Sequence, residues 1–540
     1  MQRNAVRAKR RLRRSRLRSP FAAAARSPPP HLDMSQVIQW ERLFVLHRGD
    51  ALPLQSKLRR LIVDAVLDGR LGQGSALPSS RELAARLGIS RNTVTAAFVQ
   101  LMDEGFLEAR PRSGVFVAQN ARLPRADPVE PGAAAADRAS RGPDWGSRVH
   151  RSLAGRPTLA KPQRWRDYAY PFVYGTFDAE LFPADDFREC CARLLARSQL
   201  PRWTSDFETE DVPDLVEQIR TRLLPQRGVF ALADEILVTV GTQHAYYLLA
   251  EALFEPSTRV GLEEPGHPHA RNSFALRSPC YLELPVDGEG LVVEAMPALD
   301  YAFVTPSHQS PTAATLSLER RHWLLTKAEV EDFVVIEDDY EAENLHSGAP
   351  MPALKSLDRS GRVVYIGSVS KSLSPVLRLG YIVAPRPLIA ELRTLRHAMV
   401  RHPSPFLQHA YALFLSLGHH ESNARRVNAV LRERLAVAAA ALARELPDLE
   451  FEMPLGGASL WLRAPAWVDA GELAALARER GVLIEVGDVF FARPPYPCPY
   501  FRLRLSSIAG ARIGEGIRAL AQAYDDLAQA RGTRPRRLAH

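Results

Sequence analysis

Lys371 is the residue of this chain whose setting is best suited to covalent chemistry. It lies in the run GSVSKSLSPVLRLG, residues 367–380. A buried lysine amine loses its proton readily and attacks an aldehyde. The hydroxyls of Ser368 and Ser370, together with the guanidinium of Arg378, suit a nearby phosphate. Pyridoxal phosphate carries both an aldehyde and a phosphate, so the segment predicts a site that holds this cofactor as an imine.

A second segment, residues 234–250, is suited to bind the phosphate of such a cofactor. Its pattern predicts a β-strand, a glycine turn and then a helix. The backbone amides of Gly241, Thr242 and Gln243 would open that helix, where unpaired N–H groups and the helix dipole favour an anion. The pattern is common in α/β proteins, so it indicates a phosphate site only in combination with Lys371.

Two further segments offer side chains for the ring of the cofactor. Residues 333–340 predict a strand with an acidic end, and open α/β sheets bind ligands at the carboxyl ends of strands. Asp338 could pair there with a protonated pyridine nitrogen, and Tyr340 could hydrogen-bond the ring oxygen. In the turn at residues 263–271, His267 could lie flat against the ring. Taken alone, the acidic residues are also typical of a strand end that meets water, and the histidine is also typical of a solvated loop.

A predicted strand near the C-terminus offers a group for a carboxylate. Residues 500–506 contain Arg502 and Arg504, and one of them could bind a carboxylate through both arms of its guanidinium. Arginines on a half-exposed strand more often face water, so both interpretations stay open. Ser310, after another predicted strand, is similarly ambiguous.

The elements that must position these groups follow a regular alternation. From residue 165 to residue 528, short runs rich in β-branched residues alternate with longer helical stretches. This alternation predicts a large α/β domain in which helices cover a mostly parallel sheet. With 540 residues the chain is too long for one compact core, and a prior of roughly 100 to 200 residues per domain predicts two to four units.

Upstream of this domain, residues 54–101 have the spacing of a helix-turn-helix. The first predicted helix has one apolar face, formed by Leu54, Leu58, Ile62 and Ala65. Residues 77–87 begin with a serine cap, and Gly88 with Ile89 makes a tight turn. In the last helix, residues 90–101, apolar side chains face inward at Val94, Phe98 and Leu101. The polar start of that helix would enter a major groove of DNA, with Arg91, Asn92, Thr93 and Thr95 at or near its N-terminus.

Residues 105–117 predict a β-hairpin that follows the last helix. Arg110, Arg112 and Gly114 lie near its tip, so the hairpin could act as a wing that touches backbone phosphates. Leu and Ala at helical spacing are also typical of any small helical module. The prediction of DNA binding therefore depends on the complete set of features.

The charge of the chain is unevenly placed. Hydrophobic residues make up 46% and charged residues 24%, which is typical of a soluble globular protein. The net charge is +9, but the first 32 residues contain ten Lys or Arg and no acid, which leaves the remainder near −1. DNA affinity of the folded part must therefore come from local placement of basic residues.

Cysteine usage and hydropathy exclude several other classes. The four cysteines are scattered and form no CxxC pair, so we expect no disulfide framework, no zinc site and no other metal. No apolar run approaches the roughly 18 residues of a membrane span. These features predict a protein of the reducing cytoplasm without a membrane partner.

The Arg-rich start of the chain has three interpretations. Its composition resembles a mitochondrial presequence, and it lacks the apolar core of a secretory signal. It could also be a disordered basic arm that adds non-specific DNA affinity, or it could precede a true translation start at Met34. We favour the start at Met34, because that residue opens the first stretch of mixed, globular composition.

Composition divides the chain into five parts. A linker is expected where prolines, alanines and charged residues replace the periodic apolar pattern. The expected parts are a basic, disordered tail at residues 1–45, a winged helix-turn-helix domain at 46–118, a linker at 119–164, the α/β domain at 165–528 and a basic C-terminal tail at 529–540.

The N-terminal domain resembles a known family. The run LPSSRELAARLGISRNTVTAAFVQLMDEGFLEARPRSGVFV closely resembles the winged helix-turn-helix of GntR-type bacterial regulators. This resemblance implies that the residues facing DNA are Arg81, Ser90, Arg91, Asn92, Thr93 and Gly114.

The order of the segments in the α/β domain resembles that of the fold-type I aminotransferases. The runs TPSHQSPT, IEDDYEAE and SVSKSLSPVLRLGY are similar to signatures of the MocR-type subfamily of GntR regulators, in which a winged helix-turn-helix precedes such a domain. The resemblance implies that pyridoxal phosphate forms an imine with Lys371. It further implies that Asp338 pairs with the pyridinium nitrogen and that Tyr340 contacts the ring oxygen. The implied phosphate contacts are Thr242, Gln243 and Arg378. Arg502 is implied as the anchor for the carboxylate of an effector.

Several positions depart from the family pattern. His267 stands where the family usually has a tyrosine, so an imidazole would stack on the ring. His269 stands where members similar to GABA-responsive regulators have an arginine, so a GABA-like effector is not supported. Ser310, Ala313 and Asp211 also differ from the usual residues, which predicts altered loops on the substrate side.

Two functions remain open on the sequence alone. The first is a bacterial transcriptional regulator that binds a promoter operator in double-stranded DNA and senses a small amino compound through imine exchange at Lys371. The second is an active aminotransferase that carries a fused DNA-binding domain. The N-terminal domain favours the regulator, for which the resemblance implies a homodimer in the cytoplasm, associated with the nucleoid when DNA is bound.

Overall fold

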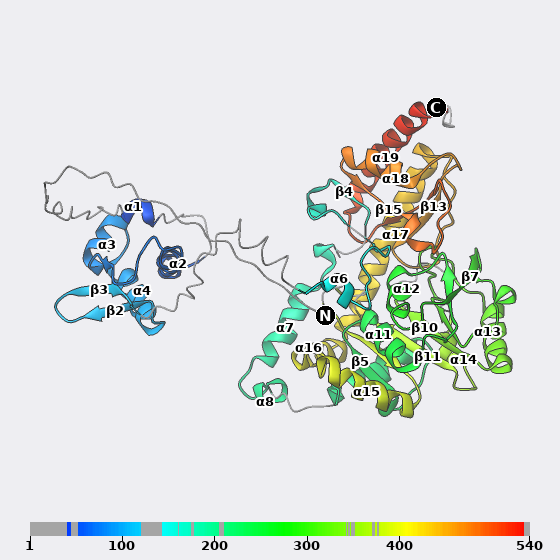
Figure 1. Ribbon diagram of the computed structural model, residues 1–540, viewed down its shortest axis with the longest axis horizontal. Helices are drawn as coiled ribbons and strands as arrows, with labels where there is room; N and C mark the ends of the chain where they lie inside the picture. The colour runs from blue at the N-terminus through cyan, green and yellow to red at the C-terminus, as the bar shows by residue number, and fades with distance from the viewer. Residues whose placement is uncertain are drawn as a thin grey trace, which may run out of the picture. The chain divides into compact units, whose positions relative to one another are not determined.

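The computed structural model of the chain describes residues 40–44, 52–119, 143–159, 161–173, 178–204, 210–341, 343, 346, 351–369, 373–374 and 377–533. The chain divides into two compact units, Met1–Asp144 and Trp145–His540 (Figure 1). The division falls inside the predicted linker at residues 119–164. Lys371 lies outside the described residues, as do Ser370 and Met34.

The described part of the first unit contains short helices and a small antiparallel sheet. Its elements are α1 (Trp40–Leu43), α2 (Leu54–Leu67), β1 (Ala76–Leu77), α3 (Ser80–Leu87), α4 (Arg91–Asp103), β2 (Leu107–Arg110) and β3 (Gly114–Val117). Val94, Phe98 and Leu101 of α4 are buried against Leu58 and Ile62 of α2, as the periodicity predicts. Helices α3 and α4 therefore form the expected helix-turn-helix.

Local capping explains where α3 and α4 begin and end. The side chain of Ser79 accepts a hydrogen bond from the N–H of Glu82, and that of Ser90 accepts one from the N–H of Thr93. Gly88 ends α3 with a φ of 64°, a left-handed conformation that glycine adopts without a Cβ clash. The hydroxyl of Ser90 is thus engaged in positioning the start of α4.

Two sequence expectations for this unit need correction. Leu54 opens α2 and is 43% exposed, so it does not join the apolar face of that helix. Leu77 lies in strand β1, which pairs with β3 in the sheet order β1-β3-β2, rather than at the start of a helix. A two-residue strand has no periodicity of its own, so its pairing was not visible in the sequence.

The second unit is built around an eight-stranded sheet in the order β5-β12-β11-β10-β9-β6-β7-β8. Neighbours from β11 through β7 are parallel, whereas β12 and β8 run antiparallel to their neighbours. The mostly parallel sheet is thus confirmed. Its strands are β5 (Ile236–Thr239), β6 (Val260–Glu264), β7 (Tyr281–Asp287), β8 (Gly290–Leu291), β9 (Tyr301–Val304), β10 (Val334–Asp339), β11 (Val363–Ser368) and β12 (Gly380–Val383).

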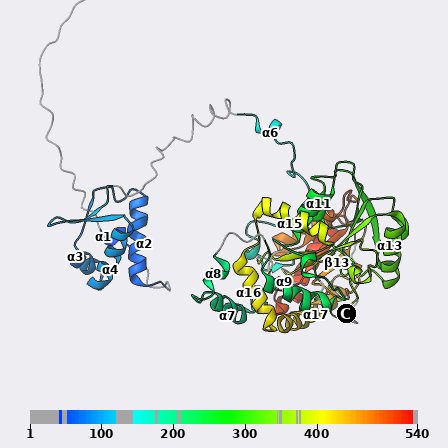
Figure 2. The ribbon, with the colours of Figure 1, turned by 90° about the horizontal axis from the view of Figure 1, so that it is seen from below.

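Helices cover both faces of this sheet (Figure 2). On one face, apolar side chains of β5, β11 and β12 pack against α11 (Thr242–Leu253), α12 (Pro268–Phe274) and α15 (Arg386–Val400). On the other face, alternate residues of the same strands pack against α9 (Pro213–Gln218) and α16 (Pro405–Ser416). Helices α13 (Leu318–Glu331) and α14 (Leu354–Leu357) cover β9 and β10. Helices α7 (Ala184–Leu194) and α8 (Leu200–Trp203) lie against α16.

A smaller subdomain follows the sheet. An antiparallel sheet in the order β13-β16-β15 packs with helices α17 (His419–Glu445), α18 (Ala470–Glu479) and α19 (Gly510–Ala530). Its strands are β13 (Ser459–Arg463), β15 (Glu485–Val486) and β16 (Tyr500–Arg504), and β14 (Val482–Leu483) pairs separately with β4 (Tyr170–Pro171). Among the described helices of the chain, none is long and apolar enough to cross a membrane.

Candidate cofactor site and DNA-binding face

The sheet topology brings the candidate segments to one edge. Strands β5, β6, β9, β10 and β11 all point in the same direction, because β12 is antiparallel to both β5 and β11. The glycine turn at Gly241, the turn at His267 and the acidic end of β10 therefore lie at the carboxyl edge. The segment that carries Lys371 starts at the end of β11, at the same edge. This edge is where open α/β sheets bind ligands.

A cavity of about 150 Å³ opens at this edge. It collects the predicted cofactor residues that the structure describes, together with Arg502. The residues that line it are Leu159, Thr242, Gln243, Tyr246, His267, His269, Ser310, Asp338, Tyr340, Arg378, Arg502 and Arg504.

One end of the cavity is built to hold an anion. Gly241 caps the N-terminus of α11 with a φ of 74°, and Thr242 and Gln243 form the first turn, which contains no acidic residue. The guanidinium of Arg378 reaches the same point and donates to the carbonyl of Val240 at 3.2 Å. A Cβ at Gly241 would lie 3.1 Å from this guanidinium, so a larger residue would require the arginine to shift, in addition to adopting a left-handed φ. Free helix N–H groups and an arginine together suit a phosphate.

The cavity also presents a buried carboxylate. Asp338, near the end of β10, is 1% exposed, and its Oδ2 accepts a short hydrogen bond from the hydroxyl of Tyr246 on α11. Burial and the charge of Asp338 raise the pKa of Tyr246 well above its usual value, so the phenol remains a donor. Burial likewise raises the pKa of Tyr340, which keeps its hydroxyl protonated beside the cavity. The sequence interpretation missed Tyr246, because a tyrosine on an apolar helix face looks like an ordinary core residue.

The position of His267 is fixed by its own helix. Its Nδ1 accepts a hydrogen bond from the N–H of Ala270 at 3.3 Å and so caps α12. The ring meets Tyr246 edge to face, with centroids 5.9 Å apart, and lies 5.6 Å from the ring of His269. Both imidazoles thus line the cavity, which leaves stacking of His267 on a cofactor ring a prediction.

The two arginines of β16 are buried rather than solvated. The Nε of Arg502 donates to Glu485 Oε2 at 2.6 Å, and its guanidinium lies 4.6 Å from the ring centroid of Phe490. Among the described residues, the two terminal nitrogens of Arg502 make no further hydrogen bond, and the side chain lines the cavity. Arg504 is paired with Glu341. Arg502 therefore offers a fork for an oxyanion, and Glu485 orients it from the cross-strand position on β15.

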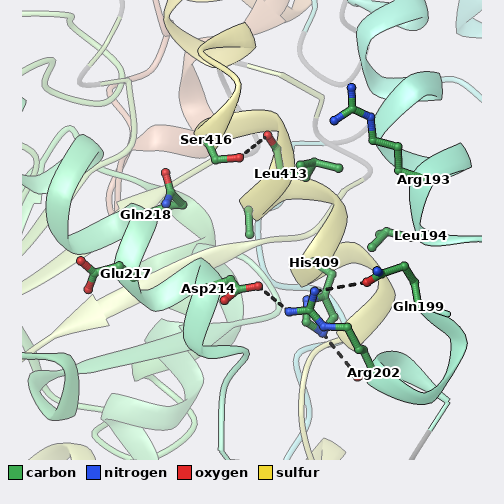
Figure 3. Close-up of a pocket in the computed structure, with 11 residues that line it drawn as sticks. Arg193, Leu194, Gln199, Arg202, Asp214, Glu217, Gln218, His409, Leu413 and Ser416 are labelled. Carbon is green, nitrogen blue, oxygen red and sulfur yellow. Dashed lines mark hydrogen bonds and ion pairs between the residues drawn. The ribbon is translucent and has the colours of Figure 1, made fainter.

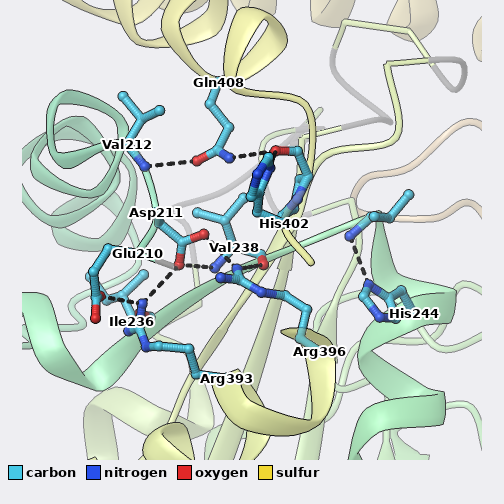
Figure 4. A network of polar contacts seen from close by, with 12 residues as sticks. Glu210, Asp211, Val212, Ile236, Val238, His244, Arg393, Arg396, His402 and Gln408 are labelled. Carbon is cyan, nitrogen blue, oxygen red and sulfur yellow. Dashed lines mark hydrogen bonds and ion pairs between the residues drawn. The ribbon is translucent and has the colours of Figure 1, made fainter. Parts of the chain in front are cut away.

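A buried network holds the end of β5 next to the turn at Gly241 (Figure 4). Asp211 accepts from the N–H of Val238 at 3.0 Å, and Arg396 donates to both Asp211 and the carbonyl of Val238. The Nδ1 of His244 accepts from the N–H of Val240 at 3.1 Å. Asp211 does not line the cavity, so the altered residue supports the sheet rather than a loop that contacts a ligand.

A second cavity, of about 380 Å³, lies between α7, α8, α9 and α16 (Figure 3). Arg202 lines it, but its guanidinium already contacts Asp214 at 2.6 Å and Gln199 at 3.2 Å. None of the predicted site residues lines this cavity. The smaller cavity is therefore the candidate cofactor site, because the turn at Gly241 and the buried carboxylate of Asp338 both lie there.

In the first unit, the predicted DNA contacts gather at the starts of α3 and α4. Arg81 and Arg91 are exposed there, and neither makes an ion pair among the described residues. Arg112 at the tip of the hairpin is also exposed and has no such pair. Elsewhere in the unit, several arginines contact acids, namely Arg59 with Glu104, Arg70 with Asp68, Arg86 with Glu82 and Arg110 with Glu108. The unpaired arginines are thus available for phosphates or bases.

The remaining predicted contacts lie on the same elements. Asn92 is exposed in the first turn of α4, and Thr93 packs partly against the cap formed by Ser90. Gly114 opens β3 with a φ of 113°, a conformation that would strain any other residue. Helix start and hairpin therefore have the geometry of a recognition helix with a wing.

Comparison with known proteins identifies the family of each unit. A model of the bacterial regulatory proteins of the gntR family matches residues 54–117, and a model of the aminotransferases of class I and II matches residues 208–511. The chain is 42% identical to the HTH-type transcriptional regulator TauR of Rhodobacter capsulatus, over 89% of this chain and 98% of TauR. It is 32% identical to the probable rhizopine catabolism regulatory protein MocR of Rhizobium meliloti, over 89% and 96%. The chain is a MocR-type regulator of the gntR family.

Solved structures confirm the fold of the second unit of this MocR-type regulator. The kynurenine aminotransferase of Pyrococcus horikoshii is 23% identical with a TM-score of 0.64, and covers 73% of this chain and 99% of its own. The α-aminoadipate aminotransferase LysN of Thermus thermophilus is 27% identical with a TM-score of 0.64, over 73% and 99%. The protein is therefore a DNA-binding transcriptional regulator with an aminotransferase-like domain.

The cofactor of this MocR-type regulator is pyridoxal phosphate, as membership of the aminotransferase family indicates. The cavity has the groups that such a cofactor requires. The start of α11 and Arg378 suit the phosphate, whereas buried Asp338 and protonated Tyr340 suit the ring.

Proposed function

We propose that this regulator senses a small amino compound by exchange of the imine at Lys371, and that the exchange alters its affinity for promoter DNA. The observation that supports this proposal best is the fork of Arg502, which is held by Glu485 and turned toward the same cavity as the cofactor groups. An amine that also carries an acidic group would fit between them.

Each group of the cavity would have one task. The cofactor supplies an aldehyde that amines capture and a ring that withdraws electrons. Thr242, Gln243 and Arg378 would hold the phosphate, and Asp338, with its proton donor Tyr246, would hold the ring nitrogen. Arg502 would bind the acidic group of the effector.

Lys371 itself would retain the cofactor until an effector amine takes its place. The released lysine amine would then remain at the site and be able to return. In this proposal, His267 would stack on the cofactor ring, and the hydroxyl of Tyr340 would donate a hydrogen bond to the ring oxygen.

The DNA-binding residues would act in pairs. We propose a homodimer, in which two copies of α4 meet two half-sites of an operator, with Arg81, Arg91, Asn92 and the wing on the DNA. Light scattering should give twice the chain mass of 60.0 kDa. A purely monomeric protein at working concentrations would exclude this arrangement. Such a regulator would work in the bacterial cytoplasm, at the nucleoid when bound.

An active aminotransferase would use the same lysine, aspartate and arginine. The two functions differ in turnover, so the test is incubation of the cofactor-loaded protein with a panel of amino acids and keto acids. The proposal predicts at most slow, substoichiometric amino-group exchange. Sustained turnover that is abolished by Lys371→Ala would instead establish an enzyme.

A further inference from the structure

The chain segment that leads away from the first unit reaches the cofactor cavity. The boundary between the units lies at Asp144 and Trp145, and Leu159 follows shortly after it. The side chain of Leu159 is half-buried and lines the cavity, whereas every other lining residue lies beyond residue 240. One wall of the cavity therefore comes from the predicted linker.

Leu159 also lines a neighbouring cavity of about 340 Å³. This neighbour lies between the linker and the C-terminal subdomain, and Glu485 belongs to its lining. Glu485 in turn holds Arg502, which lines the cofactor cavity. Leu159 and the ion pair of Glu485 with Arg502 thus form part of the wall between the two cavities.

Few contacts hold the linker at this place. We name residues 156–159 the strap. Among the described residues, the N–H of Arg156 donates to the carbonyl of Leu153 just upstream at 3.1 Å, and one hydrogen bond joins the strap to residues beyond the predicted linker, from Asn272 Nδ2 to the carbonyl of Pro157 at 2.9 Å. Pro157 and Thr158 are exposed, and the cavity beside Leu159 leaves its apolar contacts incomplete. A segment with so few contacts is displaced at a low cost in free energy.

The hydrogen bond from Asn272 ties the strap to a helix that contributes to the lining of the cofactor cavity. Asn272 belongs to α12, which His267 caps and on which His269 also lies. A ligand that moves the histidines would act on the helix that holds Pro157, and a ligand on Arg502 would lie in the cavity that Leu159 lines.

We infer that Leu159 contacts the effector directly and selects for the apolar stem between its amine and its acidic group. The inference rests on the proposed function. Leu159, Arg502 and the residues that would hold the cofactor line one cavity of about 150 Å³, so an effector whose amine is at the cofactor and whose acidic group is on Arg502 would lie beside Leu159. Leu159 favours a short apolar stem, and the strap changes position when the stem is bound.

Two small probes test this inference without knowledge of the effector. Aminooxyacetate has an aminooxy group that condenses with the cofactor carbonyl and releases the amine of Lys371, and it carries a carboxylate for Arg502. Methoxyamine performs the same condensation and has no acid. Loss of the visible absorption band of the full-length, cofactor-loaded protein reports capture of either probe.

The readout for the strap is hydrogen–deuterium exchange of peptides that cover residues 151–164. Aminooxyacetate should change their exchange rate by about threefold or more, whereas methoxyamine should change it less, because only the first probe reaches Arg502. Leu159→Ala should slow capture of aminooxyacetate by about threefold or more through loss of the apolar contact. The matched control is Leu153→Ala, since Leu153 is 39% exposed in the same segment and lines neither cavity.

The outcomes separate the two claims. If aminooxyacetate is captured but exchange of residues 151–164 is the same with and without it, the strap does not respond and the inference is wrong. Equal rates of aminooxyacetate capture by Leu159→Ala and Leu153→Ala would show that Leu159 does not contact the effector. Failure of both probes to reach the cofactor in the wild type would instead contradict the proposed function. Unchanged absorption bands and melting temperatures in both variants exclude misfolding as the cause.

Discussion

The hydroxyl of Tyr246 and the carboxylate of Asp338 form the buried contact on which the ring side of the cavity depends. Both residues are 1% exposed, and the phenol stays protonated because burial and the neighbouring charge raise its pKa. A hydrogen bond to a buried charged group contributes about 1.5 to 3 kcal/mol, more than one between neutral groups. Tyr246 therefore holds the carboxylate where a protonated pyridine nitrogen would meet it.

Replacement of Tyr246 by phenylalanine should weaken cofactor binding. The change removes the hydroxyl, which donates to Asp338 and is also hydrogen-bonded by the side chain of Thr242, and keeps the ring that packs against Phe274 and Phe303. We expect a roughly tenfold or greater rise in the Kd for pyridoxal phosphate, from loss of about 1.5 to 3 kcal/mol. Fluorescence titration of the cofactor-free protein measures it. Tyr247→Phe is the matched control on the same helix, and equal affinities of the two variants would remove Tyr246 from the site.

The sequence predicts the groups of the site that lie in short, ordered motifs. Asp338, Tyr340 and Arg378 line the cavity, because each belongs to a run whose position after a strand is set by local sequence. Tyr246 and Glu485 were not predicted. Their roles arise from contacts with Asp338 and Arg502 across the fold, and no local pattern distinguishes them from ordinary helix and strand residues.

The position of the first turn of α11 depends on the hydrogen bonds that fix the backbone just before it. Val238 and Val240 are fixed from below by Asp211, Arg396 and His244 (Figure 4). Burial, and then the charges of Arg396 and Arg378, lower the pKa of His244 to about 4. The imidazole is therefore neutral at pH 7, as its role as an acceptor for the N–H of Val240 requires.

Titration of His244 should reduce stability in mildly acidic solution. In the unfolded chain a histidine gains its proton below about pH 6.5, whereas folded His244 resists protonation down to about pH 4. The contribution of neutral His244 to the free energy of unfolding is therefore complete above pH 6.5 and is lost as the pH falls toward 4. His244→Asn keeps an acceptor that does not titrate.

Urea unfolding at pH 7 and pH 5 measures this effect. The loss of unfolding free energy between the two pH values should be about 1 kcal/mol smaller in His244→Asn than in the wild type, after allowance for partial solvent screening of the ring. His322→Asn on the exposed side of α13 is the control. Parallel pH dependence of all three proteins would show that His244 is not the group concerned.

Helix α4 and the hairpin present a small set of unpaired arginines. Capping by Ser90 leaves the side chains of Arg91 and Asn92 exposed in the first turn, where a recognition helix meets base edges. Because the chain after its first 32 residues is nearly neutral, it supplies no overall positive field for DNA. Affinity for DNA must therefore come from these local arginines. The helix-turn-helix was predictable because its caps and apolar spacing are local, whereas β1 was not, since only its partner β3 defines it.

Arg91→Ala should weaken binding to operator DNA by about tenfold or more, since a base contact contributes about 1 to 3 kcal/mol. If the side chain binds phosphate instead, the slope of log K against log salt should fall by about 0.9, with equal losses on unrelated DNA. Fluorescence anisotropy at several salt concentrations distinguishes the two cases. Arg70→Ala is the control, because Arg70 contacts Asp68. An Arg91 variant that binds like the control would exclude this face of α4.

The chain joins two units, and the sequence reveals the separate function of each one. It does not reveal how binding at one unit could affect the other. The winged helix-turn-helix of the first unit and the α/β domain of the second unit each carry family motifs, so both folds could be predicted. The role of Leu159 could not, because a leucine in a segment without periodic apolar residues gives no sign of the cavity that it meets. The strap's tertiary contacts, on which the inferred response to the effector is based, are likewise not encoded in sequence motifs.

The coupling between cofactor and DNA is the central claim, and one binding experiment tests it most directly. The protein is used at full length and loaded with cofactor, and its Kd is measured for promoter DNA beside its own gene. Aminooxyacetate is then added until the visible absorption band shows complete capture. Protein treated with borohydride, in which the imine at Lys371 is reduced and cannot exchange, serves as the control.

Capture should change the Kd for promoter DNA by about fivefold or more in untreated protein, which corresponds to a typical coupling free energy between two sites. The borohydride-treated protein should show one Kd with and without the probe. Complete capture in the untreated protein with an unchanged Kd would contradict the account, because the imine would then carry no information to the DNA-binding unit.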